Sequence, residues 1–290
     1  MMRRIRTVAV LPTLFTLGNL VCGFFAVVVA SRIPAPESAL GPPAIEIQSQ
    51  SPLGVVRQLD REDPTHNLML CGWLIFLAMI FDALDGHVAR MARATSDFGA
   101  QLDSLCDLVT FGVAPAILLV KMCPTFSFEH PQAIWLIAAL FTACAALRLA
   151  RFNVETGQDN DHMQFSGLPT PAAAAVIAGF AILSYTLHKE SMFNVYSDYR
   201  WWMQSLLPLF AVLIALLMVS RIPYPHVVNQ IFRGQRSFGH VVKLVFALAV
   251  VMMGGGYAVP IICCVFVLGP PLRYFWNMAF SRQDIKEPLF

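Results

Sequence analysis

Long apolar segments are the feature that most restricts how this chain of 290 residues can fold. A helix needs about 20 mostly apolar residues to cross the hydrocarbon core of a bilayer. Within lipid, a helix also satisfies its own backbone hydrogen bonds. Eight segments meet the requirement, at about residues 8–30, 67–89, 99–122, 132–152, 170–188, 204–220, 241–257 and 259–277. The sequence therefore predicts an all-α, polytopic transmembrane helical bundle, with a six-helix core and about two C-terminal helices.

Composition supports the same class. Hydrophobic residues make up 57% of the chain and charged residues only 13%, whereas a soluble globular domain carries roughly 25% charged residues. The net charge of +2 is too small to indicate a nucleic-acid partner. The first apolar run is too long for a cleavable signal peptide, so we expect it to remain as a span.

The distribution of lysine and arginine predicts the orientation. If the N-terminus is cytoplasmic, 14 of the 20 basic residues fall on or near the cytoplasmic side and 6 fall outside. Cytoplasmic loops are enriched in these residues. We therefore expect a multi-pass protein of the inner (cytoplasmic) membrane, with cytoplasmic termini and its active site facing the cytoplasm. The proline-rich connection 31–66 is then an exposed extracytoplasmic loop.

Four aspartates fall inside the second and third apolar segments, where carboxylates are costly and usually functional. Asp82 and Asp85 are three residues apart near the end of the second segment, and Asp103 and Asp107 are four apart near the start of the third. Each pair therefore lies on one face of its helix. The two helices are antiparallel and joined by the short segment 90–98, so we expect all four carboxylates to meet at one depth.

Carboxylates so close together repel unless they take up protons or bind cations. Oxygen ligands without Cys or His favour hard cations such as Mg²⁺ or Mn²⁺, and two such ions can clamp a phosphoryl displacement. Gly86, Ala89 and Gly99 are small enough for a bulky ligand to approach the backbone, and Arg90 is placed to meet a phosphate. The alternative is an acidic helix pair that serves as a proton or cation path, as in a transporter.

These positions resemble the signature of the CDP-alcohol phosphatidyltransferase family. Eight defined residues over 26 positions match, in the order Asp82-x-x-Asp85-Gly86-x-x-Ala89-Arg90, eight residues, Gly99-x-x-x-Asp103-x-x-x-Asp107. The resemblance implies that Asp82, Asp85 and Asp103 hold two divalent cations, Mg²⁺ or Mn²⁺, and that Asp107 binds metal and acts as the general base. It also implies that the CDP-lipid is bound by Gly86, Ala89, Arg90 and Gly99.

The first apolar segment resembles the opening helix of the serine-transferring branch of this family. It reads Leu-Pro-Thr-Leu-Phe-Thr-Leu-Gly-Asn-Leu from residue 11, and it departs from the branch at Thr13, where many relatives have Asn. Thr16 and Asn19 share a face of this helix. They either contact the CDP-lipid or form hydrogen bonds between helices.

Two further segments resemble the same branch, at residues 147–153 and 165–173. A serine carboxylate needs a cation, and Arg148 and Arg151 lie one turn apart at the expected depth. The predicted serine-binding residues are Arg148, Arg151, Asn153 and Gly167. The arginines alone favour snorkelling to lipid phosphates; the resemblance of segment 165–173 is what favours a role in substrate binding.

The resemblance covers most of residues 8–225. It implies a catalytic membrane domain at 1–225, in which 31–66 is an insertion, followed by a C-terminal helix pair at 226–290. The implied substrates are CDP-diacylglycerol and L-serine. Glycerol 3-phosphate, inositol phosphate and choline stay open as alternative acceptors. The resemblance further implies a homodimer in the lipid bilayer.

Overall fold

The computed structural model describes residues 10–33, 64–92, 97–156, 167–189, 193–224 and 256–274, together with Trp276 and Phe280. Every regular element in this part of the chain is helical, which confirms the predicted all-α class. The elements are α1 (Val10–Ser31), α3 (Pro64–Ala92), α4 (Asp97–Asp107), a π-helical segment (Leu108–Val113), α5 (Ala114–Met122), α6 (Pro124–Glu129), α7 (Pro131–Thr156), α8 (Thr170–Lys189), α9 (Phe193–Val219) and a C-terminal helix (Gly256–Tyr274).

Six helical stretches of the described residues are long and apolar enough to cross a membrane. They confirm a polytopic membrane protein and match the predicted segments closely. The apolar part of α9 is shorter, at Met203–Val219. The predicted span 241–257 lies almost wholly outside the described residues, and the last helix begins at Gly256 rather than 259. Pro260 lies one turn into it, where the missing N–H removes a single helical hydrogen bond.

The third span is one continuous rod with an irregular middle. Residues Phe98–Met122 run through α4, the π-helical segment and α5. The π-helical segment begins directly after Asp107, and its Thr110, Phe111 and Gly112 are buried. Such wide turns are rare in helices and occur mostly at functional sites.

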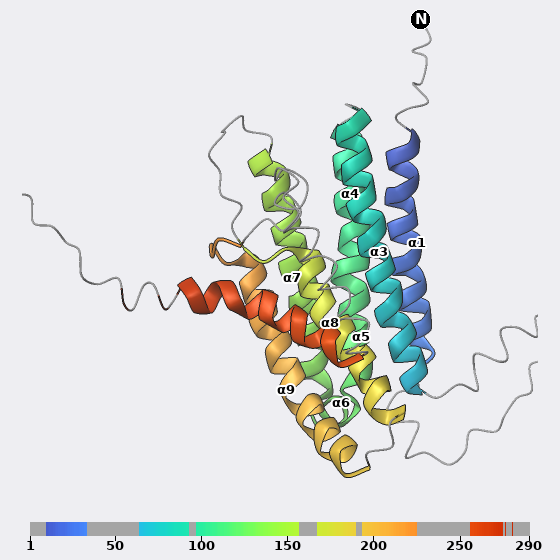
Figure 1. The fold of residues 1–290 in the computed structure, drawn as a ribbon, viewed down its shortest axis with the longest axis vertical. Coiled ribbons are helices and arrows are strands. Elements are labelled where there is room, and N and C mark those ends of the chain that lie inside the picture. The colour runs from blue at the N-terminus through green and yellow to red at the C-terminus, as the bar shows by residue number, and fades with distance from the viewer. Residues whose placement is uncertain are drawn as a thin grey trace, which may run out of the picture.

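Helix α1 lies beside α3 (Figure 1). It also packs against α4 and the π-helical segment, so it touches both helices that carry the aspartates. Helix α8 packs on the other side of α3 and on α9, and α7 packs on α9. Small residues permit these contacts: a Cβ at Gly72 of α3 would lie 2.8 Å from the Ala178 carbonyl oxygen of α8. Close backbone approach of this kind is typical of helices that associate within lipid.

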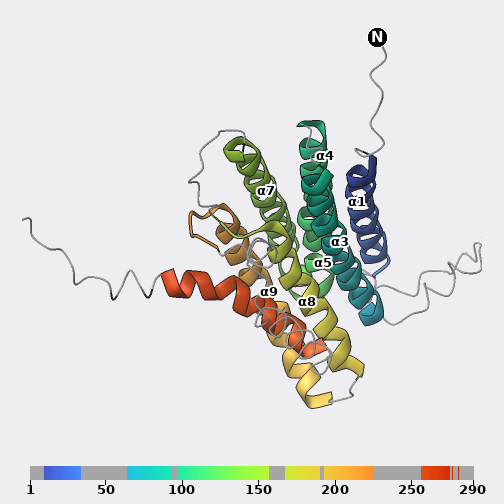
Figure 2. The ribbon, with the colours of Figure 1, turned by 45° about the horizontal axis from the view of Figure 1, so that its top comes forward.

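The C-terminal helix runs at a slant to the bundle in both views (Figures 1 and 2). Contacts with α8 and with Tyr224, after the end of α9, hold it there. A Cβ at Gly179 of α8 would lie only 3.1 Å from Pro260 Cα. The Tyr224 hydroxyl donates a hydrogen bond of 2.9 Å to the Val267 carbonyl. Burial raises the pKa of Tyr224 to about 12, so the phenol remains a donor at any physiological pH.

Candidate active site

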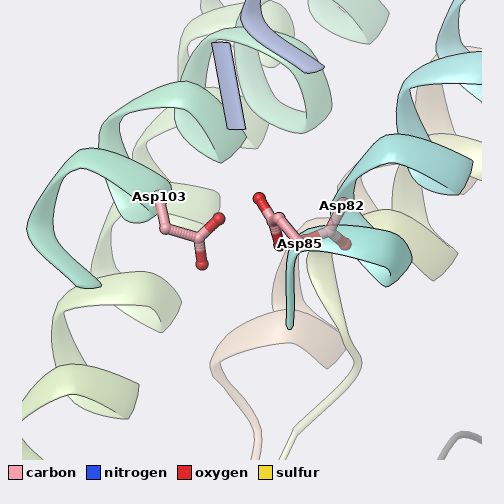
Figure 3. A group of neighbouring side chains, drawn as sticks. All are labelled: Asp82, Asp85 and Asp103. Atoms are coloured by element: carbon pink, nitrogen blue, oxygen red, sulfur yellow. The ribbon is translucent and has the colours of Figure 1, made fainter. Parts of the chain in front are cut away.

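Three carboxylates meet within the bundle. Asp82 and Asp85 project from the last third of α3, and Asp103 projects from α4. One carboxylate oxygen of each lies within 4.8 Å of the others. Figure 3 shows that the side chains from the two helices point toward one another. The helical spacing of each pair and the reversal of the chain between α3 and α4 together produce this arrangement.

The three residues fit a hard divalent cation. Asp85 is only 5% exposed, and its Oδ2 and the Oδ1 of Asp103 are buried without a hydrogen-bond partner among the described residues. A buried anionic oxygen without a donor is costly. A cation between the two helices would satisfy both oxygens, and the all-oxygen donor set suits Mg²⁺ or Mn²⁺.

Asp107 is buried one turn beyond Asp103, at the last position of α4. It is not part of the group of three whose oxygens approach within 4.8 Å. The Asn19 amide of α1 donates a hydrogen bond of 2.9 Å to Asp107 Oδ1. The position of the fourth carboxylate therefore depends on the hydrogen bond from α1 as well as on helix α4 itself.

Helix α1 contacts a second aspartate. The Thr16 side chain is hydrogen-bonded to Asp85, and Thr16 is 6% exposed while Asn19 is fully buried. These contacts are the hydrogen bonds between helices that the sequence left open as an alternative for the two residues. Contact of either residue with a lipid substrate stays a prediction.

Arg148 of α7 brings a positive charge near this cluster. Its charge acts on Asp107 and Asp82. The guanidinium lies 5.5 Å from the centre of the Phe152 ring and donates to the Thr170 hydroxyl over 3.4 Å, a long hydrogen bond. Arg148 is therefore near the aspartates, and its hydrogen bond to Thr170 is weak.

Arg151 and Gly167 instead contact the end of α9. Arg151 Nη1 donates to the Val219 carbonyl over 3.1 Å, and the Gly167 N–H donates to the Ile222 carbonyl over 2.9 Å. Gly167 has a φ of +96°, and a Cβ there would lie 2.5 Å from the Met218 carbonyl oxygen. Only glycine suits this conformation and this space.

Asn153 lies at the end of α7 that the sequence predicts to be cytoplasmic, and it is hydrogen-bonded to Ser104 of α4. Asn153 Nδ2 donates to Ser104 Oγ over 2.9 Å, so the predicted acceptor segment is joined to the residue after Asp103. Ser104 occupies a variable position of the motif, and no local pattern could have indicated its partner 49 residues away. Of the remaining predicted residues, Gly86 and Gly99 lie in α3 and α4, and the side chains of Ala89 and Arg90 lie outside the described residues.

These observations define a class: a polytopic α-helical membrane protein with an acidic, cation-compatible site between its helices. The sequence profile of CDP-alcohol phosphatidyltransferases matches residues 9–217. This protein belongs to the CDP-alcohol phosphatidyltransferase family.

Three relatives narrow the comparison. The chain is 42% identical over 161 residues to the CDP-diacylglycerol–serine O-phosphatidyltransferase of Methanocaldococcus jannaschii, covering 55% of this chain and 65% of the relative. It is 35% identical over 156 residues to the archaetidylserine synthase of Methanothermobacter thermautotrophicus, covering 53% and 57%. It is 30% identical over 216 residues to the CDP-diacylglycerol–serine O-phosphatidyltransferase of Bacillus subtilis, covering 74% and 90%. The match thus spans less than two thirds of the length of both archaeal relatives.

Proposed function

We propose that this protein transfers a phosphatidyl group from CDP-diacylglycerol to the hydroxyl of L-serine, giving phosphatidylserine and CMP in a metal-dependent reaction. The observation that carries the proposal is the convergence of Asp82, Asp85 and Asp103 within a chain of this family. The relatives from Methanocaldococcus jannaschii and Bacillus subtilis are named as serine O-phosphatidyltransferases, which favours serine as the acceptor.

The aspartates have separate roles in this proposal. Asp82, Asp85 and Asp103 would hold the cations, with Asp107 as a further ligand. Divalent cations bound there would neutralise the diphosphate and the departing CMP phosphate. Asp107 would also accept the proton of the serine hydroxyl. The serine oxygen then forms a bond to the lipid-side phosphorus, the bond from that phosphorus to the CMP oxygen breaks, and CMP leaves with the bonding electrons.

The donor and acceptor would approach from different helices. On the donor side we assign the nucleotide to the small positions Gly86, Ala89 and Gly99 and its phosphate to Arg90. On the acceptor side, Arg148 is the cation for the serine carboxylate, because its charge already acts at the cluster and an arginine can bind a carboxylate through two hydrogen bonds.

The other predicted acceptor residues support this region of the fold. Asn153 is joined to α4 through Ser104, and Arg151 and Gly167 hold the end of α9 against α7 and α8. We keep all three as proposed serine-site residues, with Arg148 as the one in direct contact with the substrate.

The setting of the enzyme is proposed as well. The bias of basic residues supports a site that faces the cytoplasm from the inner membrane, where both CDP-diacylglycerol and serine are accessible. The family resemblance supports a homodimer and a catalytic domain at 1–225.

Release of CMP from CDP-diacylglycerol tests the function directly. Purified protein is supplied with Mg²⁺ or Mn²⁺ and with serine, glycerol 3-phosphate, inositol phosphate or choline in turn, and the lipid product is identified by mass spectrometry. Release that requires both metal and serine is expected. Asp103→Asn should abolish it, whereas the matched control Glu129→Gln, an exposed carboxylate on α6, should not.

The other outcomes separate the alternatives. Release with a different alcohol would retain the chemistry and overturn serine as the acceptor. Absence of release with every alcohol, together with metal or proton flux in proteoliposomes, would replace the transferase proposal by the cation-transport alternative.

A further inference from the structure

Helix α1 contributes no carboxylate, yet it packs against both carboxylate-bearing helices and against the π-helical segment. Its polar side chains at this level, Thr16 and Asn19, are both buried. Each is hydrogen-bonded to an aspartate from a different helix: Thr16 to Asp85 of α3 and Asn19 to Asp107 of α4.

Asn19 is held from two directions. Its amide nitrogen donates to Asp107, and its main-chain carbonyl accepts a hydrogen bond of 3.2 Å from the Thr110 hydroxyl. Thr110 lies three residues after Asp107, in the π-helical segment. The chain segment that carries Asp107 therefore also binds, through Thr110, the backbone of Asn19, whose side chain binds Asp107.

The close approach of the two helices keeps this arrangement in register. Gly23 follows Asn19 by one turn, and a Cβ at Gly23 would lie 2.8 Å from Thr110 Cα. The two backbones can approach this closely only because Gly23 has no side chain. The wide π-helical turn and the glycine on α1 together bring the Thr110 hydroxyl to the Asn19 carbonyl.

The stability of the fold does not explain why residue 19 is an asparagine. It is fully buried, and its Oδ1 has no hydrogen-bond partner among the described residues. Leaving a buried polar atom unsatisfied is unfavourable, and an apolar residue of the same shape would avoid this cost. Within the described part of the chain, the hydrogen bond that the Asn19 amide donates goes to Asp107, so the reason for an asparagine at this position is its donation to that carboxylate.

We propose that Asn19 is a positioning residue for Asp107, and that Thr110 holds Asn19 in place. By orienting Oδ1 of Asp107, the amide sets the direction of the second carboxylate oxygen toward the cations and the acceptor hydroxyl. The part of this inference that concerns turnover rests on the proposed function, whereas the part that concerns the carboxylate site does not.

The test measures Mn²⁺ binding and turnover in the purified full chain. Electron paramagnetic resonance gives the Mn²⁺ dissociation constant without substrate, and CMP release gives kcat and the KM for CDP-diacylglycerol. Asn19→Leu removes the hydrogen bond to Asp107, and Thr110→Val removes the hydrogen bond to the Asn19 carbonyl, both at similar side-chain volume. Thr110→Ser retains the hydroxyl. The matched control is Asn67→Leu, another buried asparagine, near the opposite end of α3.

Loss of a residue that orients a metal ligand typically costs about 10- to 100-fold in metal affinity or activity. We expect Asn19→Leu and Thr110→Val to weaken Mn²⁺ binding and to lower kcat in this range, with little change in the KM for CDP-diacylglycerol. Thr110→Ser and Asn67→Leu should behave like the wild type. If Asn19→Leu does not fold, the Thr110→Val and Thr110→Ser pair carries the same test.

Three results would overturn the inference. The first is wild-type Mn²⁺ affinity and kcat in Thr110→Val and Asn19→Leu. The second is equal impairment in Thr110→Ser and Thr110→Val, which would indicate packing rather than the hydroxyl. The third is an effect confined to the KM for CDP-diacylglycerol, which would make Asn19 a lipid contact. Absence of turnover in the wild type would overturn the proposed function, and the Mn²⁺ measurements would then decide on Asn19 alone.

Discussion

Replacement of Arg148 by alanine is expected to raise the KM for serine, because this guanidinium is the proposed partner of the serine carboxylate. A hydrogen bond to a charged group contributes about 1.5–3 kcal/mol, and each 1.4 kcal/mol is about tenfold in affinity. The expected increase in the serine KM is therefore roughly 10- to 150-fold. Little stability should be lost, since the hydrogen bond of Arg148 to the Thr170 hydroxyl is long, at 3.4 Å.

The matched variant is Arg151→Ala, one turn along the same helix. Arg151 donates to the partly buried Val219 carbonyl over 3.1 Å, and loss of a typical hydrogen bond costs about 0.5–1.5 kcal/mol. This variant should lower the Tm more than Arg148→Ala does and should change the serine KM less. Arg148→Lys keeps the charge but not the paired donors, so its serine KM should fall between wild type and alanine.

The assay is CMP release at saturating CDP-diacylglycerol with serine varied, alongside thermal unfolding of each variant in detergent. The reasoning would be refuted if Arg151→Ala, at undiminished Tm, raised the serine KM as much as Arg148→Ala. It would also be refuted if Arg148→Ala changed only the KM for CDP-diacylglycerol.

Three further changes test the packing around the site. Gly167→Ala should destabilise the fold by at least about 1–2 kcal/mol, the cost of a left-handed conformation for a residue with a side chain, and should lower the Tm. Ser104→Ala and Asn153→Ala should each reduce stability, and the double variant should lose less than the sum, because the two side chains bind each other; strict additivity would contradict the pairing. Tyr224→Phe should lower the free energy of unfolding by about 1 kcal/mol through loss of the hydrogen bond to Val267, and an unchanged Tm would count against that contact as an anchor of the C-terminal helix.

Much of the fold can be predicted from local pattern because lipid leaves a chain few choices. A long apolar segment in a bilayer has to be helical, so the runs at 99–122 and 170–188 correspond within a residue or so to the observed spans Phe98–Met122 and Thr170–Lys189. The convergence of Asp82, Asp85 and Asp103 is predictable for a related reason. Helical periodicity places each pair on one face, and a short connection forces the two helices to run antiparallel at the same depth.

The partners of single polar side chains are not predictable in this way. Arg148 and Arg151 occupy equivalent sequence environments one turn apart, yet the first faces the aspartates and the second binds the end of α9. Their directions depend on where α8 and α9 pack against α7. The π-helical turn after Asp107 likewise has no sequence pattern of its own, and its Thr110 packs against Gly23 of α1.

By itself, the sequence determined that this protein is a helical membrane protein with acidic residues gathered between two of its spans, because hydrophobicity and helical period act over a few neighbouring residues. Only the tertiary structure decided that α1 binds Asp85 and Asp107 through Thr16 and Asn19, although it contributes no carboxylate. Hydrogen bonds between helices form between residues as far apart as 91 positions. Their geometry is set by how closely the backbones approach, which no local pattern encodes.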